Sequence, residues 1–187
     1  MRGNYRTALG STGSGGEQGV TLIELLIVVA MVAILLTVGV PSFEALANRT
    51  QVQGETDQFR EAMQRARQEA LSRGVAVSVC QRDNNDTCAG GDNAEWEQGW
   101  LVFVDDDNDG ARASGETILH VKQGLRDGYT LRPKGDAQAL TFEASGGTDN
   151  AYVFRVCGPD ADTSEGDKLR LNVAGRVNND GEPQGCS

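Results

Sequence analysis

The sequence predicts an α+β fold, with one long N-terminal helix packed on a mostly antiparallel β-sheet head. Two patterns carry this prediction. An apolar run at residues 20–43 is followed directly by an amphipathic stretch at 44–74, and both have the length and spacing of helices. Short β-rich runs separated by Gly, Asp and Asn fill residues 75–187. A chain of 187 residues has room for one globular domain and such a helical extension.

Composition and charge argue against a nucleic-acid binder of the usual basic kind. The formal net charge is -10, aromatic residues make up 5% and there are 24 glycines, which together indicate an acidic, loop-rich surface. The charge is also uneven, because Leu25 to Phe43 holds no charged residue while Asp and Glu concentrate after Arg82. We therefore expect the two ends of the chain to face different solvents.

Residues 1–19 have the composition of a hydrophilic leader. They contain Arg2, Arg6, several Gly and Ser, and no apolar run, so they cannot supply the hydrophobic part of an ordinary secretory signal. An ordinary signal places its apolar stretch before a small residue at the cleavage site, whereas here the small residue, Gly19, precedes the apolar stretch. Removal of this leader would leave the apolar segment on the mature protein.

The apolar segment at 20–43 is long enough to span a membrane. As a helix it measures about 36 Å, against a bilayer core of roughly 30 Å. Glu24 is its charged exception, and a carboxylate in hydrocarbon is costly unless it is paired. We expect it to pair with the amine at Val20 of a neighbouring subunit and to set axial register; the alternative is a carboxylate that reaches the headgroups. Pro41 removes one helical hydrogen bond, which predicts a kink or local melting.

The stretch at 44–74 continues the helix as an amphipathic segment. Apolar residues recur at helical spacing and predict a stripe that packs on a sheet rather than binding a cofactor. Gly74 is placed to cap the helix at its C-terminus. The stripe consists of Val52, Phe59, Met63, Ala66, Ala70 and Leu71.

The head is predicted to consist of short, mostly antiparallel strands. Trp96 and Trp100 flank the start of one strand, and we expect both to be buried under the helix stripe. His120 has no nucleophile near it in its strand and is expected to be structural. The predicted strands are 75–79, 99–104, 117–121, 129–133, 140–143, 152–157 and 168–173.

The cysteines indicate two disulfides. Cys80, Cys88, Cys157 and Cys186 form an even set without C-x-x-C spacing, which argues against a zinc site. If the head is exported, disulfides are expected, and of the three pairings that four cysteines allow we favour Cys80 with Cys88 and Cys157 with Cys186. The alternative is four unpaired thiols in a cytosolic protein.

The junction between leader and apolar run resembles a known processing signal. Gly19 followed by Val-Thr-Leu-Ile-Glu and an apolar run is similar to the type III signal of type IV pilins and type II secretion pseudopilins. The resemblance implies that prepilin peptidase cuts after Gly19, that Val20 becomes the N-methylated N-terminus, and that Glu24 is the assembly glutamate. Val20 departs from the Phe or Met that the family usually has there. Related pilins carry a proline at the place of Pro41.

The rest of the chain narrows the resemblance to the GspH/FimT family. The segments QRARQEALSRG, EWEQGWLVFVDDDNDG and AGRV are similar to that family, and the match runs from Gly19 to about Val177. It implies a pilin-like fold and a structural filament subunit, a minor pilin that helps to initiate a type IV pilus at its tip. The alternative is a type II secretion pseudopilin. Either would have an inner-membrane helix, a periplasmic head, and other pilin or pseudopilin subunits as partners.

An acidic stretch fits a calcium-loop pattern. Asp105, Asp107, Asp109, Gly110 and Glu116 match D-x-D-x-D-G-x(5)-E residue for residue. Hard oxygen ligands at alternate positions and a final bidentate glutamate could wrap one Ca²⁺. The predicted neighbours are strands rather than the two helices of an EF-hand, and acidic turns also arise from turn chemistry alone. Calcium binding and a plain acidic turn both remain open.

Two further functions are considered and set aside. Some FimT-like minor pilins take up DNA through a basic GRxR-type segment, but after Gly175-Arg176-Val177 this chain has Asn178 in place of the second arginine. With an acidic head around Arg176, we expect little attraction for phosphate. Catalysis is not expected either, because the chain has one histidine, no GxSxG and no P-loop. An anchored periplasmic enzyme is the weakest alternative.

Overall fold

The computed structural model describes residues 19–83, 85–90, 95–159, 166–180 and 186, so the predicted leader at 1–18 lies outside the described residues. The chain divides into two compact units, Met1–Ser42 and Phe43–Ser187. The elements, in chain order, are α1 (Leu22–Arg73), β1 (Val77–Gln81), η1 (Trp96–Gln98), β2 (Trp100–Val104), β3 (Ile118–Lys122), β4 (Thr130–Pro133), β5 (Ala139–Phe142), β6 (Tyr152–Cys157), β7 (Gly166–Leu171) and β8 (Val177–Asn179).

Helix α1 has the bounds that its end signals predict. At its start, the Oγ1 of Thr21 accepts a hydrogen bond of 3.3 Å from the Glu24 amide, so Thr21 is the N-cap. At its end, Gly74 adopts a φ of 68° and donates its N–H to the Ala70 carbonyl at 2.9 Å, as expected for a glycine C-cap. The backbone stays helical through Pro41, so the local melting considered for that residue is absent; the kink stays a prediction.

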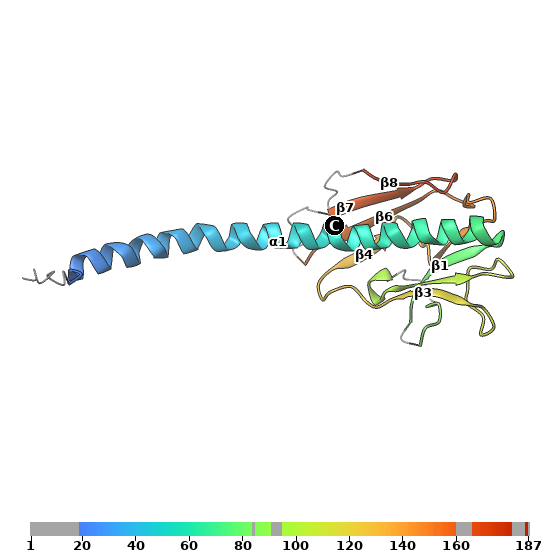
Figure 1. Ribbon diagram of the computed structural model, residues 1–187, viewed down its shortest axis with the longest axis horizontal. Helices are drawn as coiled ribbons and strands as arrows, with labels where there is room; N and C mark the ends of the chain where they lie inside the picture. The colour runs from blue at the N-terminus through green and yellow to red at the C-terminus, as the bar shows by residue number, and fades with distance from the viewer. Residues whose placement is uncertain (1–18, 84, 91–94, 160–165, 181–185, 187) are drawn as a thin grey trace, which may run out of the picture. The chain divides into compact units, whose positions relative to one another are not determined.

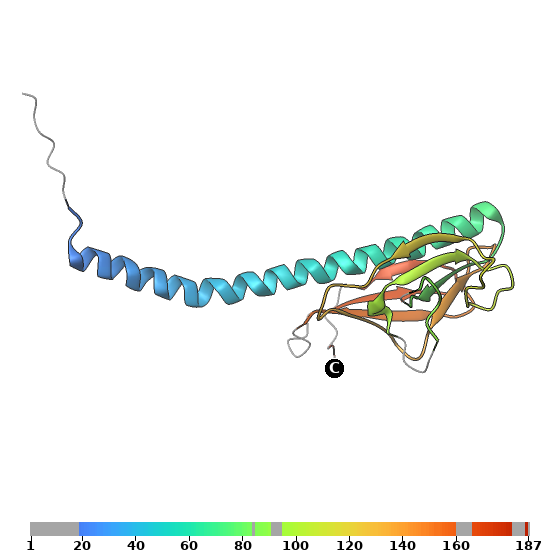
Figure 2. The same ribbon diagram turned by 90° about the horizontal axis from the view of Figure 1, so that it is seen from below.

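The strands of the second unit form two antiparallel four-stranded sheets. Their orders are β3-β2-β1-β5 and β4-β6-β7-β8. The part of α1 that belongs to this unit lies along both sheets, with β1 and β3 on one side and β6, β7 and β8 on the other (Figure 1). Turned by 90°, the strands all lie on one face of that helix (Figure 2). This arrangement confirms the predicted α+β fold.

The core lies between α1 and the two sheets. Phe59 is fully buried and makes edge-to-face contacts with Trp96, Trp100 and Phe154, at centroid distances of 5.4, 4.9 and 4.8 Å. Both tryptophans are therefore buried under the helix stripe, as predicted. Such aromatic pairs add roughly 0.5–1.5 kcal/mol each beyond their buried area.

The prediction of the buried stripe is wrong for one residue, Leu71. Val52, Met63, Ala66 and Ala70 are buried, but Leu71 is 50% exposed. The reason is geometric, since each residue advances about 100° around an α-helix and Leu71 directly follows the buried Ala70. Leu71 therefore lies at the flank of the stripe rather than in it.

β8 has no clear sequence signal, and β1 has other bounds than the sequence predicts. β8 has the sequence Val-Asn-Asn, which is poor in β-formers, and it forms because its backbone pairs with β7 from Leu169↔Asn179 to Leu171↔Val177. β1 begins two residues later than predicted and extends to Gln81, because it pairs with β2 along its whole length, up to Gln81↔Trp100. Backbone pairing outweighs side-chain preference in both cases.

Candidate functional site

The β2–β3 connection contains the acidic stretch, and Asp105 anchors it. This carboxylate is 1% exposed at the end of β2. Its Oδ2 accepts hydrogen bonds from the Ser78 hydroxyl at 2.5 Å and from the Gly110 amide at 3.0 Å, and its Oδ1 accepts one from the Asp109 amide at 3.2 Å. The Ser78 hydroxyl lies in turn 2.6 Å from that of Thr141 in β5. Asp105 thus folds the loop back onto the first sheet.

Glu116 closes the other end of the same loop. It is 7% exposed, and its two carboxylate oxygens accept hydrogen bonds from the amides of Asp106 at 2.8 Å and Ala113 at 2.7 Å. Hydrogen bonds to a charged acceptor are stronger than neutral ones. Glu116 therefore holds the two arms of the loop together through backbone amides.

Three carboxylates of the loop lie close enough to share one cation. Oxygens of Asp105, Asp107 and Asp109 lie within 4.8 Å of one another, in a group that does not include Glu116. Partial loss of hydration, and then the negative charges of Asp109, Glu116 and Asp105, raise the pKa of Asp107. The exposed Asp107 and Asp109 thus concentrate negative charge beside the buried Asp105, and hard oxygen ligands of this kind suit Ca²⁺ or Mg²⁺.

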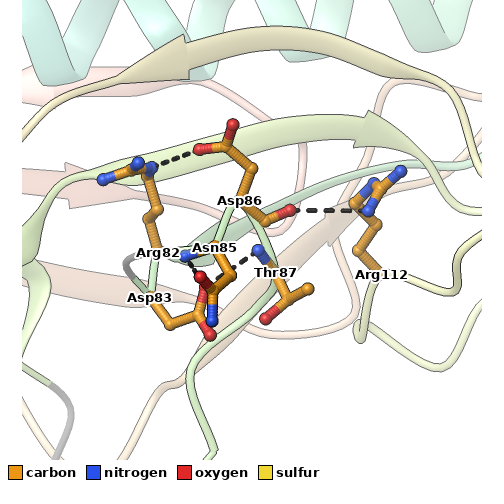
Figure 3. A network of polar contacts seen from close by, with 6 residues as sticks. All are labelled: Arg82, Asp83, Asn85, Asp86, Thr87 and Arg112. Atoms are coloured by element: carbon orange, nitrogen blue, oxygen red, sulfur yellow. Dashed lines mark hydrogen bonds and ion pairs between the residues drawn. The ribbon is translucent and has the colours of Figure 1, made fainter.

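A disulfide-closed loop lies against the acidic loop. Cys80 and Cys88 are bonded, with Cα atoms 5.6 Å apart. Inside the loop, the Asp83 Oδ1 accepts hydrogen bonds from the amides of Thr87 at 3.0 Å and Asn85 at 2.8 Å, and the hydrogen bond from Thr87 is the main cause that lowers the pKa of Asp83. Arg82 pairs with Asp86 at 2.6 Å. These contacts within the loop hold its turn (Figure 3).

Arg112 connects the acidic loop to the disulfide-closed loop. The sequence analysis did not predict a role for it. Its Nη1 donates to the main-chain oxygen of Asp86 at 3.4 Å and its Nη2 to that of Glu116 at 3.2 Å, the first of which appears in Figure 3. Its backbone amide approaches the Cys88 sulfur at 3.2 Å. Nothing in the sequence pattern marks this arginine, because its side chain bonds main-chain oxygens, and one of them, that of Asp86, belongs to a distant segment.

The second disulfide joins Cys157 at the end of β6 to Cys186, with Cα atoms 5.9 Å apart. The structure thus has the cysteine pairing that the sequence analysis favoured. Cys157 is buried on the second sheet, whereas the acidic loop leaves the first sheet. The two disulfides therefore hold different parts of the head.

The N-terminal candidates lie at the start of α1. Gly19, Val20 and Glu24 are exposed, and Glu24 is the third residue after the Thr21 cap. Thr-x-x-Glu at a helix start is the pattern of a capping box, so the sequence also contains a signal for the first residue of this helix. Among the described residues, no helix combines the length and the apolarity needed to cross a membrane.

The remaining candidates have modest local roles. The Arg176 amide donates to the Asn172 side chain at 3.0 Å and the Arg176 carbonyl accepts from the Asn172 amide at 3.1 Å, which closes the turn before β8. Its side chain is exposed. His120 is half-buried in β3, and burial, followed by the Arg65 charge, lowers its pKa.

Comparison with known families decides the class of the chain. The family model described as Type II transport protein GspH matches residues 55–175. The chain belongs to the GspH family. Its match begins inside α1 and ends in the turn before β8, so it includes the acidic loop and the first disulfide, while Gly19, Val20, Glu24 and Cys186 lie outside it.

Solved structures show the same fold. The type IV minor pilin FimU of Pseudomonas aeruginosa superposes with a TM-score of 0.58 at 24% identity, covering 76% of this chain and 99% of that one. The minor pseudopilin EpsH from the type 2 secretion system of Vibrio cholerae gives 0.50 at 12% identity, covering 69% and 95%. No curated protein sequence matches significantly. The GspH-family chain thus has a pilin-like fold, which confirms the predicted resemblance.

Proposed function

We propose that this GspH-family chain is a structural subunit of a pilin-like filament, a minor pilin that helps to initiate a type IV pilus at its tip. Membership of the GspH family, with a pilin-like head, is the observation that carries the proposal. A structural role also agrees with the acidic loop, whose two most buried carboxylates, Asp105 and Glu116, are used to hold backbone amides.

The N-terminal segment supplies the route into the filament. Prepilin peptidase cuts after Gly19, Val20 becomes the N-methylated N-terminus, and residues 20–43 anchor the chain in the inner membrane with its head in the periplasm. Glu24 then pairs with the amine of a neighbouring subunit, since a carboxylate in hydrocarbon needs a partner. The partners are accordingly the membrane, the peptidase, and other major and minor pilins. DNA is not among them, because the chain carries a net charge of -10.

A type II secretion pseudopilin is the second candidate. A family described by type II transport supports it, and both a minor pilin and a minor pseudopilin have the fold of this head. Deletion of the gene separates the two. Loss of surface pili with normal secretion supports the pilus, and loss of secretion with normal pili supports the pseudopilus.

The mechanism of assembly is tested on the N-terminal segment itself. Mass analysis of the membrane-bound chain should find a methylated N-terminus at Val20; an intact Met1 contradicts the pilin assignment. Glu24→Gln keeps a residue that a capping box accepts but removes the charge, whereas Thr21→Ala removes the cap and keeps the charge. If Glu24 sets register, Glu24→Gln should lose incorporation into filaments while Thr21→Ala retains most of it. The reverse ranking shows that capping, not register, is the role of this turn.

The acidic loop supports a second, accessory proposal. We infer that Asp105, Asp107 and Asp109 bind Ca²⁺ with a Kd on the order of 10⁻⁴ to 10⁻³ M, the range of extracellular modules. The observation that favours it is the grouping of their oxygens within 4.8 Å. Calcium should then raise the melting temperature of the chain, since a ligand that binds only the folded state stabilises it.

A further inference from the structure

The first sheet carries a small hydrophobic cluster on the face that points away from α1. Side chains alternate between the two faces along a strand, so Trp100 and Val102 of β2 join the core under the helix. Leu101 and Phe103 point the other way and form a separate cluster with Cys80 of β1. All three members of this cluster are buried, so other parts of the chain must cover them.

Both the disulfide-closed loop and the acidic loop lie on this face. The disulfide-closed loop brings Cys88 against the cluster, and Ala139 of β5 packs there too. The acidic loop reaches across the sheet to β5, since a side-chain carbon added at Gly110 would lie 3.4 Å from the Ala139 Cβ. The two loops therefore share the task of covering one apolar surface.

The contact between the loops depends on the shape of the disulfide-closed loop. Arg112 donates to the Asp86 main-chain oxygen at 3.4 Å, and its amide approaches the Cys88 sulfur at 3.2 Å. Its third contact, to the Glu116 main-chain oxygen, stays within the acidic loop. The Arg112 Nε is buried and has no acceptor among the described residues. A buried donor without a partner is costly, so weaker contacts to the other loop would favour release of this side chain to water.

The Cys80–Cys88 disulfide restricts the residue that Arg112 binds. Asp86 has a φ of 55°, in the left-handed region that few residues other than glycine adopt. Its side chain pairs with Arg82 at 2.6 Å, and its main-chain oxygen faces Arg112 (Figure 3). The disulfide closes a short loop around it, with a sequence separation of 8, and so limits the conformations open to it. With this bond broken, Asp86 can return to a common conformation and turn its oxygen away from Arg112.

We propose that the Cys80–Cys88 disulfide is a redox-dependent switch for residues 111–116 of the acidic loop. In the oxidised chain Arg112 holds this segment against the disulfide-closed loop. In the dithiol chain Arg112 is released and the segment opens, while Asp105 keeps the start of the loop on the sheet. Closure is a thiol–disulfide exchange. The two cysteines give up two electrons and two protons as their S–S bond forms, and the S–S bond of a disulfide-bearing oxidant breaks to give two thiols. The switch needs neither calcium nor a filament partner.

Amide hydrogen exchange, followed by NMR on the ¹⁵N-labelled full chain in detergent, measures the opening. The Ala113 amide, which donates to the Glu116 side chain, and the Glu116 amide, which donates to the Ala113 carbonyl, report on the segment. The Thr148 amide, which donates to the Val173 carbonyl at 2.9 Å, is the reference outside both loops. A local opening speeds exchange at the first two amides and leaves the reference unchanged.

A chain with one disulfide removes ambiguity about which bond is reduced. In Cys157→Ser/Cys186→Ser, Cys80–Cys88 is the remaining disulfide, so a dithiol reductant acts on it alone. Reduction should speed exchange at the two loop amides about tenfold or more, the effect of losing one hydrogen bond to a charged group. Unchanged loop amides after complete reduction overturn the switch. Equal speeding at Thr148 also overturns it, because the disulfide then holds the whole head.

Two matched variants of the parent chain test the role of Arg112 with both disulfides kept. Arg112→Gln should speed exchange at the two loop amides about as much as reduction does. Arg126→Gln removes the same charge from an exposed position of the head outside both loops and should leave their exchange unchanged. These variants decide the question even if the serine pair does not fold. Parent-like exchange in Arg112→Gln, or equal speeding in Arg126→Gln, overturns the switch.

Discussion

Glu116 and Asp107 belong to the same acidic loop, but the structure gives them opposite effects on stability. Glu116 is buried and accepts two backbone hydrogen bonds. Asp107 is exposed, and its pKa is raised by loss of hydration and by the charges around it. We therefore predict that, in chelator, Glu116→Gln destabilises the head while Asp107→Asn leaves its stability unchanged or improved.

The magnitude for Glu116→Gln follows from its two acceptors. Glutamine offers one oxygen and one NH₂, so either the Asp106 or the Ala113 amide faces another donor. A lost hydrogen bond to a charged group costs about 1.5–3 kcal/mol, which is roughly 3–12 °C of melting temperature for a domain of this size. For Asp107, removal of the charge is expected to have the opposite effect on stability. A raised pKa means that the folded state binds the proton more tightly, so the carboxylate stabilises the fold when protonated and loses that contribution as pH rises through its folded-state pKa.

Thermal unfolding of the full chain in detergent, followed by circular dichroism, measures both effects. Added calcium should raise the melting temperature of the parent chain and of Glu116→Gln, but not that of Asp107→Asn. Asp106→Asn is the matched control, because Asp106 is exposed beside the three aspartates and outside their group. If Glu116→Gln melts with the parent in chelator, the two backbone hydrogen bonds do not hold the loop. If calcium leaves the parent unchanged, the loop is an acidic turn.

Two predictions concern the core and the disulfides. Phe59→Ala removes a fully buried ring that contacts three others and should cost about 3–5 kcal/mol in chemical unfolding; a loss below about 1 kcal/mol contradicts this packing. The Cys80–Cys88 bond spans 8 residues and Cys157–Cys186 spans 29, so replacing the second pair by serine should cost about 1 kcal/mol more than replacing the first. An equal or reversed cost shows that native contacts, rather than chain entropy, set the difference.

Local sequence signals predicted the helix and most strands, because the residues that determine these elements lie within the elements themselves. The Gly74 cap, the stripe around Phe59 and the tryptophans near β2 act through spacing that is visible in the sequence. β8 was missed because its Val-Asn-Asn is held by the backbone of β7. Leu71 was misplaced because spacing alone does not define the width of the buried stripe.

The acidic loop shows the limit of motif reading. The pattern located all four carboxylates, but it assigned them one role as ligands. The structure gives the four carboxylates different roles. Which of them are buried and bonded to backbone amides depends on how the loop folds on the sheet. Arg112 and Ser78 were invisible for the same reason, since each reaches its partner across a large sequence separation.

This division bears on how calcium could bind at all. Asp105 and Glu116 already fix the loop through backbone amides. A cation would therefore bind to a loop that is already ordered, and the smaller loss of conformational entropy on binding would favour its affinity. Against this, Asp105 shares its oxygens with the Ser78 hydroxyl and the Gly110 amide. A carboxylate oxygen has further lone-pair sites, so these bonds and a cation can coexist. If the proposed calcium site exists, calcium would therefore add to a loop geometry that the backbone amides already hold, and it should stabilise the loop rather than reshape it.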